Sequence, residues 1–251
     1  MRSQRQEFLG ADGQKLAARL DVPDGDIRAY ALFAHCFTCG KDVFAASRIA
    51  QALTEHGFAV LRFDFTGLGA SEGEFANTNF SSNLADLLAA AAYLRASHKA
   101  PSLLIGHSLG GAAVLAVAGQ VPEAKAVVTL AAPSDPVRVT GLFSQHLYQI
   151  ASEGEAQVQL AGRPFRIKQQ FVEDAGGHNL KLKIAGLKRA LLVMHAPGDD
   201  TVGISNAMEI FTAAKHPKSF ISLDSADHLL TERDDAVYVA KLIAAWSDRY
   251  I

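Results

Sequence analysis

Several features are scarce or missing in this sequence of 251 residues. It has two cysteines, one tryptophan and a net charge of −2, so no basic excess draws it to nucleic acid or to an anionic membrane. No apolar run is long enough to span a bilayer, and residues 1–7 lack the apolar core of a secretory signal. We therefore expect a cytoplasmic protein in which both cysteines are reduced. The sequence also shows no repeat, low-complexity tract or linker.

What is present is an ordinary globular composition, with 49% hydrophobic and 20% charged residues. This length suits one large α/β domain that covers residues 1–251. The oligomeric state cannot be read from these features.

Short apolar runs alternate with longer amphipathic runs along most of the chain. Such alternation is typical of a mostly parallel central sheet with helices on both faces, which binds its ligands beyond the carboxyl ends of the strands. An antiparallel pair within residues 8–20 leads the sheet. The further strands are expected at 29–34, 58–63, 102–106, 126–130, 190–194 and 219–223, and helices at 44–56, 79–97, 111–118 and 236–246.

Residues 134–188 do not show this alternation of strands and helices. They include a helical stretch at 137–150 and a hairpin formed by 157–160 and 165–167, so we expect a small cap or lid. Its apolar residues either line a substrate pocket or pack the insertion onto the sheet. As pocket-lining candidates we take Phe143, Leu147 and Phe171, with Leu142 and Phe165 as further apolar residues of the insertion.

The segment Gly106-His107-Ser108-Leu109-Gly110 stands between a strand-like and a helix-like run. This context is typical of a nucleophile elbow, in which a strained turn presents a serine hydroxyl. Glycines stand two residues before and after Ser108, where a side chain would not fit. The alternative is a Gly-rich turn that happens to contain a serine.

A serine needs a base, and the base needs an orienting carboxylate. In hydrolases with this elbow, the order along the chain is serine, acid, histidine. His228 follows the strand 219–223 and is the best base, while Asp199 and Asp200 follow the strand 190–194. We prefer Asp199, because the turn Gly198-Asp199 suits a carboxylate that points across the strand ends; Asp200 is then a solvated turn residue.

The oxyanion of the reaction needs two backbone donors. One is the N–H of Leu109, and the other should come from the loop after the strand 29–34, where Phe37 is the candidate. Among the other residues of these loops, His107 would flank the nucleophile, and His195 and Asp64 are interpreted as organising their loops.

These segments resemble the α/β-hydrolase superfamily along nearly the whole chain, through "AHCFTCGKD", "LRFDFTGLGASEG", "LIGHSLGG", "HAPGDDTV" and the "DH" of Asp227-His228. More narrowly, the chain resembles the hydrolase half of fusions with an OsmC-like domain. The resemblance implies an esterase that acts on short acyl esters, with dienelactone or peptide hydrolysis as alternatives. No OsmC-like segment precedes Ile251, so we expect either a stand-alone relative or a shortened fusion.

Two functions of other classes stay open. Cys36 and Cys39 form a Cys-x-x-Cys motif between a strand and a helix, as in thioredoxin-like sites, so a redox or redox-regulated protein is the main alternative. The other is a hydrolase fold that only binds, whose sign would be a damaged triad. The predicted hydrolysis needs no metal or cofactor, and Gly67-Leu68-Gly69 lacks the third glycine of a dinucleotide fingerprint.

Overall fold

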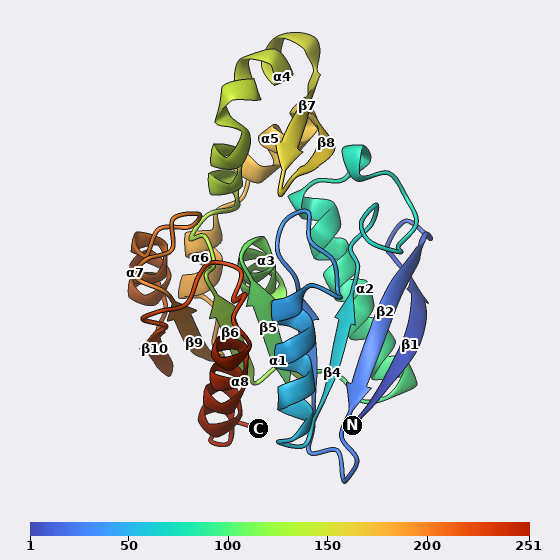
Figure 1. Cartoon of the computed structure of the whole chain (residues 1–251), viewed down its shortest axis with the longest axis vertical. Helices are drawn as coiled ribbons and strands as arrows, with labels where there is room; N and C mark the ends of the chain where they lie inside the picture. Colours follow the sequence, from blue (N-terminus) through green and yellow to red (C-terminus); the bar gives the residue numbers. More distant parts are fainter.

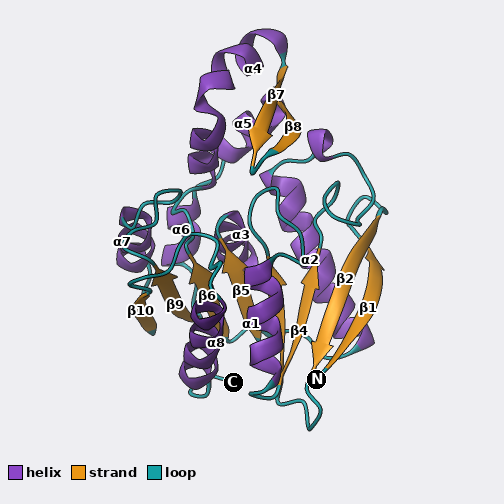
Figure 2. Cartoon of the chain, viewed as in Figure 1, coloured by secondary structure: helices purple, strands orange, loops and turns teal.

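A computed structural model describes all residues, 1–251. Its main feature is an eight-stranded sheet in the order β1-β2-β4-β3-β5-β6-β9-β10 (Figures 1 and 2). The first two strands pair antiparallel, β2 is antiparallel to β4, and all the other pairs are parallel, as predicted. The strands are β1 (Arg2–Leu9), β2 (Lys15–Val22), β3 (Ala29–Ala34), β4 (Phe58–Phe63), β5 (Leu103–His107), β6 (Ala126–Leu130), β9 (Ala190–His195) and β10 (Lys218–Ser222).

Helices cover both faces of this sheet. Apolar residues of α1 (Phe44–Thr54) and α8 (Arg233–Ser247) share one core with alternate residues of the strands. On the other face, α2 (Phe80–Ser97), α3 (Leu109–Val117) and α7 (Ser205–Ala213) contribute to a second and larger core. Because the central strands are buried on both faces, β3, β4, β5 and β6 are continuous runs of buried residues.

Local sequence explains where several elements begin and end. Asn79 caps α2 by accepting a hydrogen bond from the N–H of Ser82, and the Ser82 hydroxyl accepts from the N–H of Asn79. Gly57 has φ +82°, a conformation that favours glycine, and it follows α1 where the chain turns into β4. Two short 3-10 turns, η1 (Phe75–Asn77) and η2 (Ala118–Gln120), complete this part of the chain.

The insertion between β6 and β9 projects from the carboxyl edge of the sheet (Figure 1). It holds η3 (Pro136–His146), α4 (Leu147–Glu153), β7 (Glu155–Leu160), β8 (Arg163–Lys168) and α5 (Gln169–Gly176), which together we call the cap, residues 136–176. The expected hairpin is confirmed: its two turn residues, Ala161 and Gly162, both have positive φ, as a two-residue hairpin turn needs. The expected single helix at 137–150 is instead broken, because Phe143 has non-helical φ and ψ.

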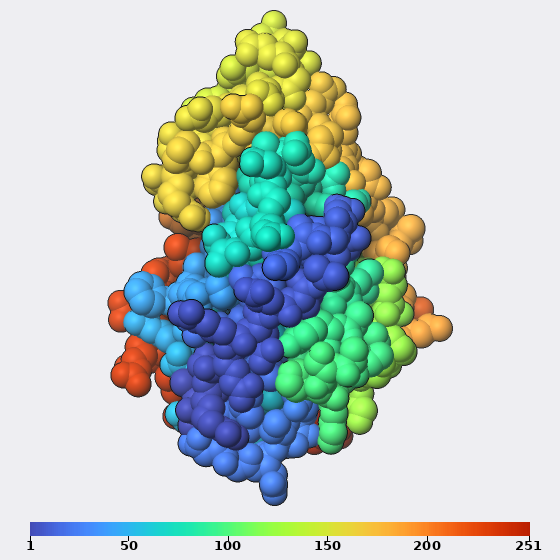
Figure 3. All heavy atoms as spheres, turned by 90° about the vertical axis from the view of Figure 1, so that its right-hand side faces the viewer, coloured from blue at the N-terminus to red at the C-terminus, as the bar shows by residue number.

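The rest of the insertion, after residue 176, packs on the helices that cover the sheet and is not part of the cap. The short helix α6 (Leu180–Ala185) packs against α3 and α7. The cap itself extends over the chain that connects β4 to α2, and there its strand β8 contacts η1. Figure 3 shows this contact from the side, with the yellow atoms of the hairpin against the teal atoms that precede α2. The cap is therefore joined to the chain before α2 through β8, and to α2 itself through α5.

Candidate active site

Ser108 lies in the sharp turn between β5 and α3. Its φ of 54° and ψ of −126° place it in a strained region, and its N–H donates to the carbonyl of Leu130 at 2.8 Å. A Cβ on Gly106 would lie 2.2 Å from the carbonyl oxygen of Gly110, and one on Gly110 would lie 2.3 Å from that of Ala34. Neither position has room for a side chain, which is the geometry that the sequence predicts for an elbow.

The structure brings Ser108, His228 and Asp199 together, although they come from three different loops. The Nε2 atom of His228 lies 3.0 Å from the Ser108 hydroxyl, and its Nδ1 atom lies 2.7 Å from a carboxylate oxygen of Asp199. The side chains reach one another because β5, β9 and β10 end at the same edge of the sheet. All three residues are buried, with at most 8% of their surface exposed.

Asp199 is held as an anion by its loop. Burial raises the pKa of its carboxyl group, but the nearby His195 ring, at 3.5 Å, and hydrogen bonds with His228 and the N–H of Val202 outweigh burial and keep the pKa well below its usual range. One oxygen accepts from the N–H groups of Thr201 and Val202 at 3.0 and 2.8 Å, and the other faces His228. Asp200, the competing candidate, is exposed and accepts a hydrogen bond from the neighbouring hydroxyl of Thr201 at 3.3 Å.

Two further histidines support this arrangement. His195 donates through Nε2 to the carbonyl of Val202 at 2.6 Å, so it organises the loop of the acid, as expected. His107 donates through Nε2 to the backbone carbonyl of His228 at 2.7 Å. Burial, reinforced by the nearby His228, lowers the pKa of His107 to about 4, so its ring is neutral at ordinary pH.

The two candidate oxyanion donors have free N–H groups. The N–H of Leu109, as the first residue of α3, has no acceptor within its helix. The N–H of Phe37 donates to no acceptor within the protein. Both residues line the same cavity as Ser108.

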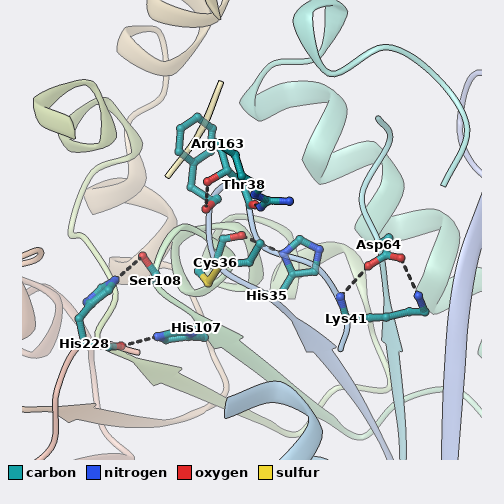
Figure 4. The surroundings of a disulfide bond; sticks show 11 residues. His35, Cys36, Thr38, Lys41, Asp64, His107, Ser108, Arg163 and His228 are labelled. Atoms are coloured by element: carbon teal, nitrogen blue, oxygen red, sulfur yellow. Dashed lines mark hydrogen bonds and ion pairs between the residues drawn. A yellow bond between two sulfur atoms is a disulfide. The ribbon is translucent and has the colours of Figure 1, made fainter. Parts of the chain in front are cut away.

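The loop that carries Phe37 is anchored on its far side by Asp64. This carboxylate accepts from the Lys41 N–H at 2.6 Å and from the Lys41 ammonium at 2.7 Å, as Figure 4 shows, and from the Ala70 N–H at 2.9 Å. Asp64 is thus a structural residue that joins the loops after β3 and β4, as the sequence indicated.

Cys36 and Cys39 form a disulfide, so the expectation that both are reduced is wrong for this structure. Their Cα atoms lie 5.3 Å apart, within the range that a disulfide can bridge. They are the two ends of a tight turn, in which the Cys39 N–H donates to the Cys36 carbonyl at 3.2 Å. The sequence shows the spacing of the cysteines but not this closure of the backbone.

A cavity of about 1070 Å³ opens above Ser108. Its floor comes from the loops after β3, β5, β9 and β10, and its roof from the cap. The roof residues that line it are Arg138, Val139, Thr140, Gly141, Leu142, Gln159, Leu160, Ala161 and Arg163.

Of the expected pocket residues in the insertion, the three main candidates lie elsewhere. Phe143, Leu147 and Phe171 do not line the cavity, so that expectation is corrected. They pack into the core instead: Phe143 is 1% and Phe171 3% exposed, and Leu147 packs beside them. Leu142, the residue before the kink at Phe143, does line the cavity.

The buried phenylalanines of the cap belong to an aromatic cluster that reaches the oxyanion loop. The ring of Phe37 lies 5.2 Å from Phe171 and 5.8 Å from Phe75, Phe75 lies 4.9 Å from Phe165, and Phe143 lies 6.4 Å from Phe171. The cap phenylalanines Phe143, Phe165 and Phe171 therefore hold the cap and the Phe37 loop together and, unlike Phe37, do not line the cavity.

The composition of the side-chain clusters and of the helices bears on metal and membrane binding. No group of three or more His, Cys, Asp or Glu side chains is arranged so that it could hold a metal ion. None of the helices combines the length and the apolar composition that crossing a membrane requires.

Comparison with known proteins gives consistent matches. The family model described as serine aminopeptidase, S33 matches residues 25–153. Among solved structures, the esterase domain of a Rhodothermus marinus protein is 51% identical, covers 100% of this chain with 99% of its own, and has a TM-score of 0.81. Est1E from Butyrivibrio proteoclasticus with bound ferulic acid is 20% identical, with coverages of 97% and 98% and a TM-score of 0.79, a likeness of fold alone.

One curated relative is the mitochondrial palmitoyl-protein thioesterase ABHD10 of Mus musculus. It is 25% identical over 192 residues, which are 71% of this chain and 62% of that protein. The chain therefore spans less than two thirds of the length of this relative.

Proposed function

Because the chain belongs to the serine aminopeptidase S33 family of α/β hydrolases, we propose that it is a serine esterase that cleaves small carboxylic esters. The observation that carries the proposal is the continuous path of hydrogen bonds from Asp199 through His228 to Ser108, at 2.7 and 3.0 Å. A hydrolase fold used only for binding has no need of this path, which is complete.

In the proposed mechanism, His228 takes the proton of Ser108 as the hydroxyl attacks the ester carbonyl. Asp199 stabilises the imidazolium that forms and keeps the ring in the required tautomer. The N–H groups of Phe37 and Leu109 bind the oxyanion, and the alcohol leaves with a proton from His228. Water activated by His228 then releases the acid from the acyl-enzyme.

The name of the family raises peptide hydrolysis as an alternative. An aminopeptidase must bind the free ammonium group of its substrate, which requires an anionic or strongly polar partner. Asp42 is the only carboxylate that lines the cavity, and it already pairs with Arg19, Lys41 and Arg62 at 3.0 to 3.2 Å. Arg138 and Arg163 also line the cavity, Arg138 paired with Glu209 at 2.9 Å and Arg163 donating to the Thr38 carbonyl. With no unpaired carboxylate in its lining, the cavity favours a neutral ester over a cationic peptide.

A thioester is the second candidate, because the matched mouse protein is named a palmitoyl-protein thioesterase. The same nucleophile and oxyanion donors would serve both reactions. Dienelactones remain a third class of possible ester. We include a cytoplasmic location in the proposal, which fractionation of expressing cells would test.

The first test is labelling with a fluorophosphonate, followed by mapping of the modified residue. We expect modification of Ser108 and no labelling of the Ser108→Ala variant, with esterase turnover reduced by about 10³-fold or more. A panel of p-nitrophenyl esters of increasing acyl length, an acyl thioester and alanine p-nitroanilide then assigns the substrate class. Near-normal turnover by Ser108→Ala, or preference for the anilide, would overturn the proposal.

A further inference from the structure

We propose that the Cys36–Cys39 disulfide is a thiol-exchange site that opens into the substrate cavity, and that the esterase needs this disulfide closed. The ligand class is a low-molecular-weight thiol or dithiol. The inference rests on the proposed esterase function, because the loop that the disulfide closes carries the oxyanion donor Phe37.

The disulfide is reached through the cavity. Cys36 and Cys39 both line the same cavity as Ser108 and His228. Cys36 is only 4% exposed, whereas Cys39 is partly exposed, so we take Cys39 as the cysteine that a thiolate entering the cavity attacks. In the view of Figure 4 the yellow sulfur lies between the side chains of Ser108 and His35.

The backbone between the two cysteines needs support. Cys36 and Cys39 are the first and last residues of a four-residue turn, with one hydrogen bond of 3.2 Å between them. The third residue, Thr38, has φ 58°, a left-handed conformation that a β-branched residue rarely adopts. The disulfide joins the ends of this turn covalently, and so keeps the second residue, Phe37, in place.

The loop has other anchors that reduction leaves intact. The Arg163 guanidinium donates to the Thr38 carbonyl, and the Thr38 hydroxyl donates to the Phe37 carbonyl at 2.7 Å. The ring of Phe37 packs against Phe75 and Phe171. Because these contacts persist, we expect reduction to loosen the turn and displace the Phe37 N–H without unfolding the protein.

The exchange itself is balanced. A thiolate attacks the sulfur of Cys39, the bond between the two cysteines breaks, and its electron pair leaves on Cys36 as a thiolate. A second thiol attacks the mixed disulfide and releases the oxidised small molecule, and Cys39 leaves as a thiolate. Both cysteine thiolates take up protons that the two thiols lose. The protein thus gains two electrons and two protons, and the reductant loses both.

The experiment compares one protein in two redox states. Oxidised protein is prepared with oxidised glutathione, reduced protein with dithiothreitol, and both are desalted under nitrogen, because free thiol cleaves the substrate directly. Turnover of p-nitrophenyl acetate is then measured. We expect kcat to fall about 10-fold on reduction, which is less than the 10²–10³-fold that complete loss of one oxyanion donor typically causes. Reoxidation should restore it.

A double variant, Cys36→Ser with Cys39→Ser, supplies the matched control. It should have the low kcat of the reduced protein and should not respond to either reagent. A second readout tests access: modification of Ser108 by a fluorophosphonate should slow the reduction of the disulfide by glutathione. The rate of reduction is measured by counting the free cysteine thiols with a maleimide at successive times.

The outcomes separate the two proposals. Equal kcat in both redox states, with Ser108 labelled in both, overturns the exchange site and leaves the esterase intact. Loss of the circular dichroism signal on reduction overturns it as well, because the disulfide would then stabilise the whole fold. If Ser108 were not labelled and no turnover were seen in both redox states, the esterase proposal would be refuted. The inference about the disulfide would then fall with it.

Discussion

The ring of His107, next to the nucleophile in sequence, donates a hydrogen bond from Nε2 to the backbone carbonyl of His228, 2.7 Å away. The elbow and the loop of the base are thereby joined directly. The other ring nitrogen, Nδ1, is buried without a partner, so a proton there would lie in an apolar environment with no acceptor. Burial of the ring thus favours a neutral His107, although the hydrogen bond to the His228 carbonyl by itself raises the pKa.

This preference for a neutral ring predicts a pH dependence of stability. The pKa of His107 is about 4 in the folded protein and near 6.5 in an unfolded chain, so the unfolded chain binds more protons between these values. The free energy of unfolding should be fully retained above pH 6.5 and fall by about 3 kcal/mol as the pH drops to 4. Urea denaturation at pH 7, 5.5 and 4.5 measures it.

The control is His107→Asn, which removes the titrating group. Its stability should depend less steeply on pH, although His35, also buried and with its pKa lowered chiefly by burial, contributes to the remaining slope. An identical slope in the variant and the natural protein would contradict this role of His107.

Much of the fold was predictable from the sequence, because burial leaves a direct mark on it. Strands buried on both faces are continuous apolar runs, so the predicted bounds of β3, β4 and β6 agree with those observed. The convergence of the Ser108, Asp199 and His228 side chains was also predictable, because parallel strands end at a common edge.

Other features could not be read from the sequence. An apolar residue in an insertion is satisfied equally by a core or by a cavity wall, so the burial of Phe143, Leu147 and Phe171 depends on tertiary packing. The helix α7 was missed because its buried face mixes the apolar Ala207 and Ile210 with the polar Asn206, and its other core contacts, Phe211 and Ala213, are only partly buried. The Arg163 contact to Thr38 joins residues far apart in sequence, and no local pattern indicates it.

The two adjacent aspartates provide a matched pair for the acid. Asp199→Asn would remove the charge that faces His228 and should reduce kcat by about 10³–10⁴-fold. Asp200→Asn changes an exposed side chain and should leave kcat within about twofold. Ester hydrolysis by the two purified variants measures both effects, and a larger loss in Asp200→Asn would reverse the assignment.

The elbow glycines predict a difference in stability between two similar substitutions. In Gly106→Ala the new methyl group would lie 2.2 Å from a backbone oxygen, which cannot move without distorting α3. We expect a loss of about 3 kcal/mol or more, at the upper end of overpacking effects. Gly119→Ala is the control, because nothing lies within 4 Å of its Cβ. Similar urea midpoints for the two variants would contradict the close packing inferred at the elbow.

The hairpin of the cap predicts a kinetic effect from a residue outside the triad. Arg163 follows the hairpin turn and donates to the carbonyl of Thr38, the residue after the proposed oxyanion donor Phe37. If this contact positions the donor, Arg163→Gln should lower kcat several-fold with little change in KM, because the oxyanion forms only in the transition state. Arg163→Lys, which keeps a cationic donor, should recover part of the loss.

Arg166 of the same hairpin supplies the control. Its side chain is 62% exposed and pairs with Glu155 at 3.4 Å, away from the oxyanion loop. Arg166→Gln should therefore leave both kcat and KM unchanged. An equal fall in kcat for the two glutamine variants would mean that the hairpin needs its positive charge for its own stability. A rise in KM alone for Arg163→Gln would mean that the guanidinium binds substrate and does not position the donor, because only an effect on kcat follows from moving the Phe37 N–H.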